Sequence, residues 1–261
     1  MRVPARRSLA IFAFAALLAA CDTAPPASPA TTANGTQRPS FETPGPPSGH
    51  TPEEIRAAIE PHLGKEVISV GEGANRVIGI GLRANAEALA RELNGRYGAA
   101  VDLTVGFFPY PPPEASQRRC VQGRQTVADH RPLLATLGID RTVVAGDFFQ
   151  GKVRLRNGGN VQYALETSSD FSVYLFRPGD PLPVGSSEGG VAGTGFRTAL
   201  AAGQAVDLDA GGGTASCDLA MGYVLPAGTY QARAFVDYNE PVTSDLRFFW
   251  SEPVLIDVVN P

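Results

Sequence analysis

Short segments in which apolar and polar residues alternate follow one another through the C-terminal half of the chain. Residues 153–156 read Val-Arg-Leu-Arg, which is the pattern of a strand with one buried face. Turn-forming sequences such as Arg177-Pro178-Gly179-Asp180 separate the segments. Further strands are predicted at residues 161–165, 171–176, 205–208, 229–236, 246–250 and 254–259. Strands of this length and spacing predict an antiparallel β-sandwich over residues 119–261.

Residues 51–108 carry a different pattern, which begins with a helix. Thr51 is a typical cap, Pro52 suits the first helical position, and Glu54 completes a capping box. Ile55 and Ile59 then recur at helical spacing, so one side of this helix is predicted to be buried.

Two strands, a second helix and a third strand are predicted to follow. Residues 67–70 and 77–82 are strand-like, Asn85 is a possible cap for a helix that Gly98 ends, and residues 101–105 alternate. The order is α-β-β-α-β, in about 58 residues that are too few to bury a large core, so we expect this module to pack on its neighbour. The fold class predicted for the whole chain is α+β.

The N-terminus has the pattern of a targeting segment. Three arginines precede the apolar run Leu9–Ala20, which is too short to span a bilayer and suits a signal peptide. The run ends in Leu18-Ala19-Ala20-Cys21, which resembles the lipobox of bacterial lipoproteins. The resemblance implies that residues 1–20 are removed and that Cys21 carries two or three acyl chains, palmitate among them, which hold the protein on a membrane outside the cytoplasm. The alternative is an ordinary secreted protein with an incidental cysteine.

Two proline-rich segments separate the predicted parts. Residues 21–50 combine the lipidated cysteine with a segment rich in Pro, Ala, Ser and Thr, which is typical of a disordered tether. Residues 109–118 contain Pro111-Pro112-Pro113 and form a stiff connector. The arginines from Arg118 to Arg141 suggest contact with anionic lipid headgroups or cell-wall polymer, or simply a solvated segment.

The charge excludes one class of partner. The chain has 22 basic and 26 acidic residues and a net charge of −4, which becomes −7 once the three arginines of residues 1–20 are removed. A general nucleic-acid-binding protein is normally basic, so we expect no nucleic-acid partner.

The chain has three cysteines. If Cys21 carries the anchor, Cys120 and Cys217 remain, and outside the cytoplasm such a pair usually forms a disulfide. The bond would close a loop of about 100 residues and contribute about 4 kcal/mol in the chain-entropy model. Two buried thiols or a metal pair are the alternatives. Without a nearby histidine the pair makes a poor zinc site, so we expect neither a metal nor another cofactor.

Three segments of the C-terminal half resemble one family. They are Ser169-Asp170-Phe171-Ser172-Val173-Tyr174, Gly195–Leu200 with the following Ala202-Gly203-Gln204, and Leu225-Pro226-Ala227-Gly228-Thr229-Tyr230. Together they resemble the BsuPI-type intracellular proteinase inhibitor domain over about 80 residues. The resemblance implies an immunoglobulin-like fold and, as a possible activity, inhibition of extracellular serine proteases by a loop within residues 179–195. The chain departs from the family in its Gly- and Ser-rich segment 181–194 and in its cysteine pair.

One segment has the form of a catalytic motif. Gly185-Ser186-Ser187-Glu188-Gly189 matches G-x-S-x-G, yet glycines follow it where a nucleophile elbow needs a helix. The three histidines all precede Ser187, whereas a hydrolase of this type places its histidine downstream. We therefore expect no enzyme, and treat Ser186 and Ser187 as candidate binding residues on a mobile loop.

Two groups of aromatic residues supply the other candidate binding residues. One precedes the proline run and the other lies near the C-terminus; the candidates are Phe107, Phe108, Tyr110, Phe248 and Trp250. Neighbouring residues of a strand point to opposite faces, so one of Phe248 and Phe249 is predicted to be in the core and the other outside it. Packing between domains is the alternative interpretation of both groups.

The sequence thus predicts a non-enzymatic, lipid-anchored protein of the bacterial cell envelope. Its partners would be the membrane, through the lipid anchor, and a protein or cell-wall component bound by the immunoglobulin-like domain. The alternative is an extracellular protease inhibitor of the BsuPI-like type.

Overall fold

Two β-sheets and two α-helices make up the parts of the chain that the structure describes. This computed structural model of the 261-residue chain describes residues 49–73, 76–114, 118–120, 132–188, 195–239 and 246–261, all within one compact unit. Cys21, the predicted signal peptide and the predicted tether up to residue 48 lie outside the described residues. No helix of the described residues is long and apolar enough to cross a membrane.

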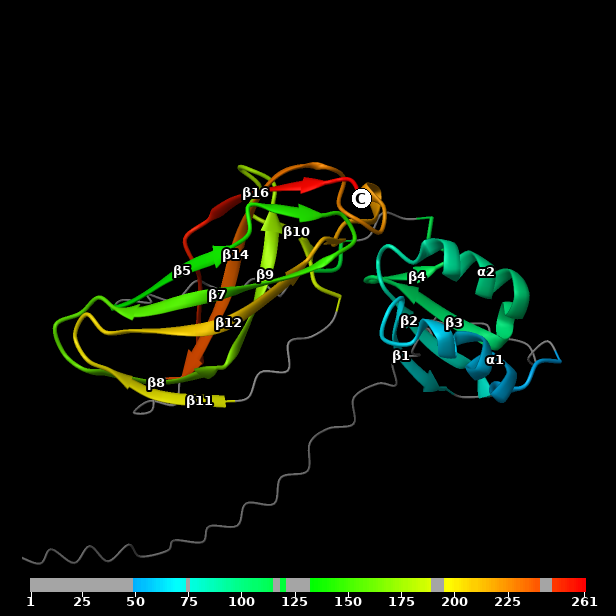
Figure 1. Cartoon of the computed structure of the whole chain (residues 1–261), viewed down its shortest axis with the longest axis horizontal. Helices are drawn as coiled ribbons and strands as arrows, with labels where there is room; N and C mark the ends of the chain where they lie inside the picture. The colour runs from blue at the N-terminus through cyan, green and yellow to red at the C-terminus, as the bar shows by residue number, and fades with distance from the viewer. Residues whose placement is uncertain (1–48, 74–75, 115–117, 121–131, 189–194, 240–245) are drawn as a thin grey trace, which may run out of the picture. The chain divides into compact units, whose positions relative to one another are not determined.

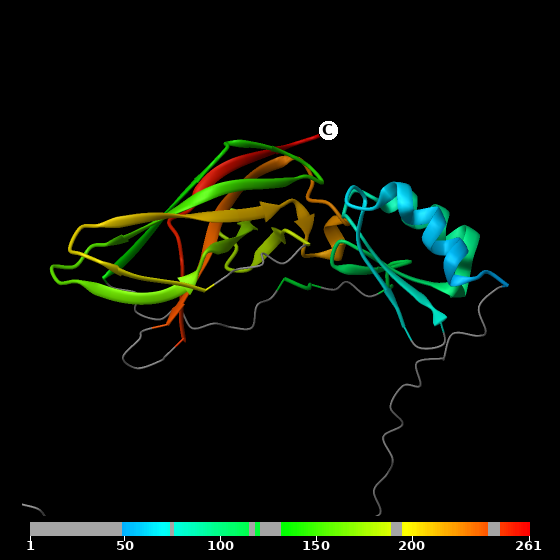
Figure 2. The same ribbon diagram turned by 60° about the horizontal axis from the view of Figure 1, so that its bottom comes forward.

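The first sheet belongs to a small module with two helices. Its strands lie in the order β1-β2-β3-β4, with β2 and β3 parallel and the other pairs antiparallel. Both α-helices lie on one face of this sheet (Figure 2). The elements are α1 (Pro52–Ile59), η1 (Glu60–His62), β1 (Val67–Glu72), β2 (Ile78–Leu82), α2 (Glu87–Tyr97), η3 (Gly98–Ala100), β3 (Val101–Val105) and β4 (Phe108–Tyr110). The last strand was not among the predicted elements.

The two helices begin in different ways. At α1 the predicted capping box is present, because the Glu54 amide donates to the Thr51 hydroxyl at 3.2 Å and the Thr51 amide donates to the Glu54 carboxylate at 3.0 Å. At α2 the cap position is Ala86, so the prediction of Asn85 as the cap is wrong. The Ala86 amide donates to the Arg83 carbonyl at 3.0 Å, which places Asn85 inside a turn that precedes the helix.

The module does not bury its core alone. Ile55, Ile59 and Tyr97 of the helices pack against the apolar side of the small sheet, and two residues from outside the module, Ala215 and Tyr223, belong to the same cluster. The module therefore leans on its neighbour, as its small size predicts.

The second sheet is larger and contains the C-terminal half of the chain. Its main path is β11-β8-β14-β9-β12-β7-β5, and shorter strands pair onto it (Figure 1). The elements are β5 (Leu133–Ile139), β6 (Thr142–Val144), β7 (Phe148–Asn157), β8 (Tyr163–Ser168), β9 (Asp170–Phe176), β10 (Pro183–Ser186), β11 (Gly195–Leu200), β12 (Ala205–Gly213), β13 (Ala215–Ser216), η4 (Leu219–Met221), β14 (Gly228–Asn239), β15 (Leu246–Trp250) and β16 (Val254–Val259).

The long strand β14 connects the parts of this sheet. One of its edges pairs with β9 and then β8, and the other pairs with β16 and then β15. In both ribbon views β5, β7 and β12 run side by side and cross β14 (Figures 1 and 2). Inward-facing residues from all of these strands form one apolar core. The described chain is therefore mostly β-sheet with few helices.

Several details of the larger sheet differ from the sequence predictions. β9 runs parallel to β12, and β6 runs parallel to β16, whereas an antiparallel arrangement was predicted. Residues 183–186 were predicted to lie in a loop, which is wrong, because they form β10 between β9 and β13. A Cβ at Gly185 would lie 2.4 Å from Leu225 Cδ1 and 3.2 Å from the Ala215 carbonyl oxygen of β13, so this crowded position favours glycine.

The predicted disulfide is confirmed. Cys120 is bonded to Cys217 across a sequence separation of 97, with their Cα atoms 5.0 Å apart. The Arg119 amide donates to the Cys217 carbonyl at 2.8 Å, and the Arg118 guanidinium lies 3.4 Å from the Asp218 carboxylate. The bond therefore holds the segment that enters the larger domain against the segment that follows β13.

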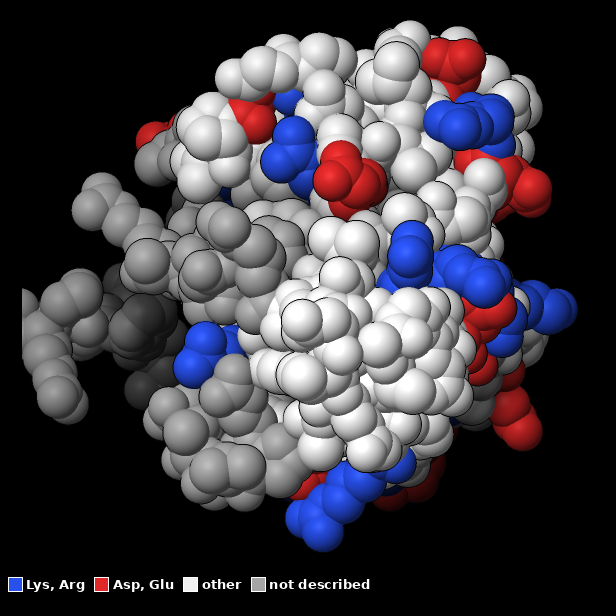
Figure 3. All heavy atoms as spheres, turned by 90° about the vertical axis from the view of Figure 1, so that its left-hand side faces the viewer, with Lys and Arg blue, Asp and Glu red and all other residues white. Residues whose placement is uncertain are grey.

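Figure 3 shows the end of the larger sheet where β7 turns into β8 and β11 turns into β12. A surface without charged side chains occupies the middle of this view. Leu134 and Val161, which are 45% and 65% exposed, lie at this end. Beneath it, the buried side chain of Asn157 donates to the Val161 and Leu200 carbonyls at 2.8 and 2.9 Å. The Asn157 side chain therefore links the β7–β8 turn to the β11–β12 turn.

Candidate functional site

The outer face of the larger sheet is the side of β14 and its neighbours that points away from the core. Alternate residues of β14 contribute to it because side chains of a strand point to opposite faces. These residues are Gln231, Arg233, Phe235, Asp237 and Asn239, all partly exposed. On β15, the directly paired residues Trp250, Phe248 and Leu246 lie beside Phe235, Asp237 and Asn239.

An aromatic cluster covers the middle of the outer face. We define it as Tyr174, Phe176, Phe235, Phe248 and Trp250. The Phe235 and Phe248 rings are stacked with centroids 5.5 Å apart, and the Phe235 and Trp250 rings are 5.1 Å apart. The rings of Tyr174 and Phe176 meet Trp250 edge-on at 5.5 and 5.2 Å. Contacts of this geometry are favourable beyond their buried area, so the cluster is a firm surface.

One end of the cluster is buried and carries a positive charge. Tyr174 and Phe176 pack with the disulfide-bonded Cys120 and Cys217. The Arg233 guanidinium lies over the Phe176 ring, 5.1 Å from its centroid, and donates to the Gln231 side chain at 2.8 Å. The disulfide thus packs against this buried end of the aromatic cluster, and the Arg233 guanidinium covers the Phe176 ring there.

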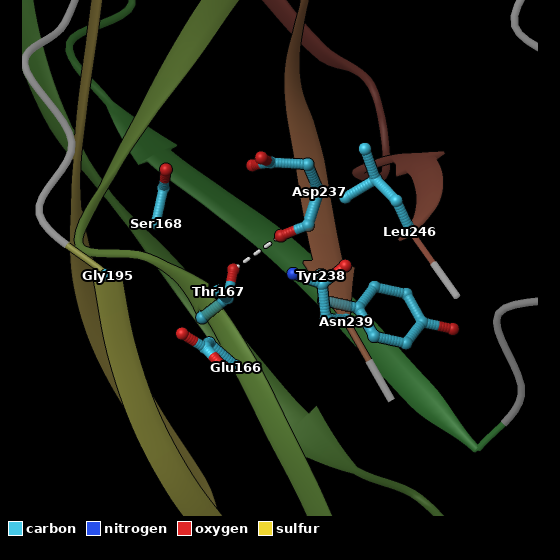
Figure 4. Close-up of a pocket in the computed structure, with 8 residues that line it drawn as sticks. All are labelled: Glu166, Thr167, Ser168, Gly195, Asp237, Tyr238, Asn239 and Leu246. Atoms are coloured by element: carbon cyan, nitrogen blue, oxygen red, sulfur yellow. Dashed lines mark hydrogen bonds between the residues drawn. The ribbon is translucent and has the colours of Figure 1, made fainter. Parts of the chain in front are cut away.

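A pocket of about 200 Å³ lies at the other end of the outer face (Figure 4). Four strands line it with mostly polar groups. The lining residues are Glu166, Thr167 and Ser168 of β8, Gly195 of β11, Asp237, Tyr238 and Asn239 of β14, and Leu246 of β15. Segments far apart in the chain therefore meet in one small, open cavity.

Strand register brings the pocket residues together. β8 pairs with β14 through Thr167 opposite Tyr238 and Glu166 opposite Asn239. The Thr167 hydroxyl donates to the Asp237 carbonyl at 2.6 Å, which holds the two strands where they meet. In Figure 4 the Asp237 carboxylate points toward Ser168 and away from the Tyr238 ring, which belongs to the core side.

The two carboxylates of the pocket have different surroundings. Glu166 accepts a hydrogen bond from Arg197 Nε of β11 at 2.9 Å, and the Arg197 side chain is 81% exposed. Asp237 is partly buried, and this desolvation raises the pKa of its carboxyl. Among the residues that the structure describes, no cationic side chain forms an ion pair with Asp237. The pocket therefore holds one paired carboxylate and one without a counter-ion.

The second aromatic group that the sequence indicated contributes to this face. Phe248 and Trp250 lie on the outer face, while Phe249 between them is buried in the core. The alternation predicted for this strand is therefore seen.

The first aromatic group is not a surface site. Phe108 is fully buried in the core of the small module, so its selection as a binding residue is wrong. Its strand β4 has a buried side facing α2, which the proline-rich sequence around it did not reveal.

The other two aromatics of this group lie at contacts. Phe107 is half-buried between two apolar clusters, and the centroids of the Tyr110 and Tyr223 rings are 6.4 Å apart. The Tyr223 hydroxyl donates to the Pro109 carbonyl at 3.3 Å, and burial raises the pKa of Tyr223 to about 12. These aromatics pack the two sheets together.

The serine segment is also not presented as a binding loop. Ser186 is buried at the end of β10, with its hydroxyl 3.4 Å from the Val173 carbonyl, so its selection as a binding residue is wrong. Ser187 is half-buried, and the next side chain, Glu188, accepts a hydrogen bond from the Ala84 amide at 3.1 Å. In the described part of this segment the chain is a strand followed by a contact with the small module. Within the described residues, no three His, Cys, Asp or Glu side chains are grouped so that they could hold a metal ion.

Sequence reasoning missed the polar half of the site. Glu166, Asp237 and Asn239 belong to no motif, and the four strands β8, β11, β14 and β15 must meet before the pocket forms. One signal was available, because residues 231–239 alternate Ala and Val with Gln, Arg, Phe, Asp and Asn. That alternation predicts a face rich in functional side chains, although it does not show which segments lie beside it.

Comparison with known proteins does not assign the chain to a family. No family model matches the chain, and no curated protein matches it. Among solved structures, the chain is similar to a cohesin module of a Clostridium perfringens family 33 glycoside hydrolase, with 11% identity, 49% of this chain and 98% of that module covered, and a TM-score of 0.25. A PapD-like domain of human CEP192 has 10% identity, covers 49% of this chain and 86% of its own, and gives a TM-score of 0.22. Function is therefore assessed from the residues of the site.

Proposed function

We propose that this chain is a non-enzymatic, lipid-anchored protein of the bacterial cell envelope. Its larger domain, which we interpret as an immunoglobulin-like β-sandwich, binds a protein or cell-wall partner at the outer face. The observation that carries this proposal is the pocket of about 200 Å³ at the end of the partly exposed aromatic cluster. Aromatic surface beside a few directed polar groups is the usual composition of a recognition site.

The construction of the outer face supports a binding role. Ring contacts, the disulfide and the β8–β14 register all hold the site in one shape. A site that is already ordered loses little conformational entropy when a ligand binds. The protease-inhibitor alternative rests on sequence resemblance alone, because the described part of residues 179–195 contains the buried strand β10.

The anchor is the first part of the proposal to test. Cys21→Ser is expected to abolish incorporation of labelled fatty acid and to release the protein from the membrane fraction, because serine provides no thioether for the lipid. Cell fractionation and metabolic labelling measure both effects, with Cys120→Ser/Cys217→Ser as the control that keeps Cys21. Labelling that persists in Cys21→Ser contradicts the anchor.

The outer face is tested by adding a bulky charge at its rim. Leu246→Arg is expected to reduce capture of the envelope partner at least tenfold, because the new side chain fills the pocket that Leu246 lines. The measurement is quantitative capture from detergent-solubilised envelopes, together with co-sedimentation with purified cell walls, using the full-length chain as bait.

Leu255→Arg is a matched control for this variant. Leu246 and Leu255 are both 54% exposed, and both lie on strands that pair with β14. Their partners on β14 are Asn239 and Gln231, so the two sites lie about 26 Å apart along the strand. Equal capture by wild type and Leu246→Arg would argue against the outer face as the binding site. Equal loss in both variants would argue against the pocket as its centre, because Leu255 lies at the far end of the same face.

A further inference from the structure

The unpaired carboxylate of Asp237 is the feature that the proposed function leaves unexplained. A carboxylate that is partly removed from water loses hydration energy, which is normally recovered from a nearby cation or from hydrogen bonds to the charged form. Asp237 has no such cation among the described residues; its carboxylate has a hydrogen bond from its own backbone amide, and burial outweighs that bond and raises the pKa of the carboxyl. The site is therefore incomplete as it stands.

The surroundings of Asp237 suit an organic cation. The carboxylate points into the pocket toward Ser168 of β8, and the other lining groups are mostly polar (Figure 4). A carboxylate in such a place binds an ammonium or guanidinium group through its charge and through charge-assisted hydrogen bonds. A neutral ligand in the same place would cover the carboxylate without replacing the lost hydration.

The pocket already contains one ion pair of this kind at its rim. Arg197 pairs with Glu166 from the strand on the other side of β8. Since Arg197 neutralises Glu166, the attraction for a further cation is concentrated at Asp237. The chain as a whole is acidic, with a net charge of −4, which favours approach of a cationic partner.

The size of the pocket limits what enters it. Sites for whole small molecules enclose about 300 to 1,000 Å³, whereas this pocket encloses about 200 Å³. One extended side chain fits in the space, while a larger ligand would remain mostly outside.

We propose that the pocket receives a single lysine or arginine side chain projecting from a partner protein, with Asp237 as its counter-ion. This inference rests on the proposed function and specifies its partner as a protein with an exposed basic residue. The rest of the partner lies over the aromatic cluster on the same face.

Three short peptides test the inference on the full-length chain in mild detergent. Each is blocked at both ends and has glycines around one central residue, which is lysine, arginine or norleucine, the last being the uncharged analogue of lysine. Saturation-transfer NMR at low salt measures binding of each peptide by titration. We expect the lysine and arginine peptides to bind at least tenfold more tightly than the norleucine peptide. Added salt is expected to lower the affinity of the two charged peptides, because it screens the attraction between charges.

Variants then locate the binding. Asp237→Asn keeps the shape of the side chain and is expected to lower the affinity for the lysine peptide about tenfold. Asp102 is an exposed carboxylate on the small sheet, and Asp102→Asn is expected to leave this affinity unchanged.

The outcomes separate this inference from the proposed function. Equal binding of the lysine and norleucine peptides, or lysine binding that survives Asp237→Asn, overturns the cation site. If Leu246→Arg still prevents partner capture in that case, the outer face remains the binding surface for a partner of other chemistry. The peptide comparison on the wild-type chain gives a result even if a variant fails to fold.

Discussion

Replacing both Cys120 and Cys217 with alanine is expected to lower the free energy of unfolding by about 4 to 5 kcal/mol. The bond joins residues separated by 97 positions, so its loss frees a long loop in the unfolded chain. Domains of this size are stable by only about 5 to 15 kcal/mol, so the variant is expected to lose a large part of its stability. Equilibrium unfolding in guanidinium chloride, followed by the fluorescence of Trp250, measures the change.

The disulfide prediction has a built-in control. A reductant is expected to destabilise the wild-type chain by a similar amount and to leave the alanine variant unchanged. Trp250 lies in the aromatic cluster next to the bond, so its emission also reports whether the outer face loosens. A change of less than about 1 kcal/mol would show that packing around Tyr174 and Phe176, and not the crosslink, holds this region.

Asn157→Asp is expected to destabilise the protein by about 3 kcal/mol at neutral pH. The Asn157 side chain is fully buried, donates to the Val161 and Leu200 carbonyls, and accepts from the Gly159 amide at 2.9 Å. An ionised aspartate accepts only, so both carbonyls lose their donor and face a buried negative charge. Denaturant unfolding of the variant and the wild type at several pH values measures the loss.

The pH dependence of this variant has a definite sign. Burial and the two carbonyls raise the pKa of the new carboxyl in the folded state above its unfolded value. The folded state therefore binds the proton more tightly, and stability falls as the pH rises from about 4 toward neutrality. Asn160→Asp is the control, because Asn160 is exposed three residues further on. A pH-independent loss, or an equal loss in the control, would contradict the role of Asn157.

Local sequence was sufficient to predict several elements of the fold. The capping box at Thr51 needs only residues within one helical turn, so the chain specifies it without help from distant contacts. Alternation likewise identified β7 and β8, and it predicted that one of Phe248 and Phe249 is in the core, which the structure shows to be Phe249. The disulfide was predictable from the number of cysteines together with the expected location outside the cytoplasm, where two thiols of one chain usually bond.

The prediction of a loop at residues 183–186 was wrong for an identifiable reason. β10 has the sequence Pro-Val-Gly-Ser, which locally favours a turn, and it becomes a strand because β9 and β13 lie on either side of it. Tertiary hydrogen bonds outweigh local preference in such short segments. Ser186 was misjudged for the same reason, since burial of β10 removes it from the surface.

The candidate site also has one part that local sequence predicts and one part that depends on strand pairing. An outward aromatic strand at residues 246–250 is a local property, because it follows from alternation along one strand, and the sequence alone was sufficient to indicate Phe248 and Trp250. The pocket is a property of register: Glu166, Asp237 and Leu246 come from three strands, and a shift of one residue in any pairing would turn its side chain to the opposite face. Register depends on which distant segments pair, and no local pattern encodes that choice. That Asp237 has no counter-ion among the described residues, and with it the expectation of a cationic partner, therefore follows only from the tertiary structure.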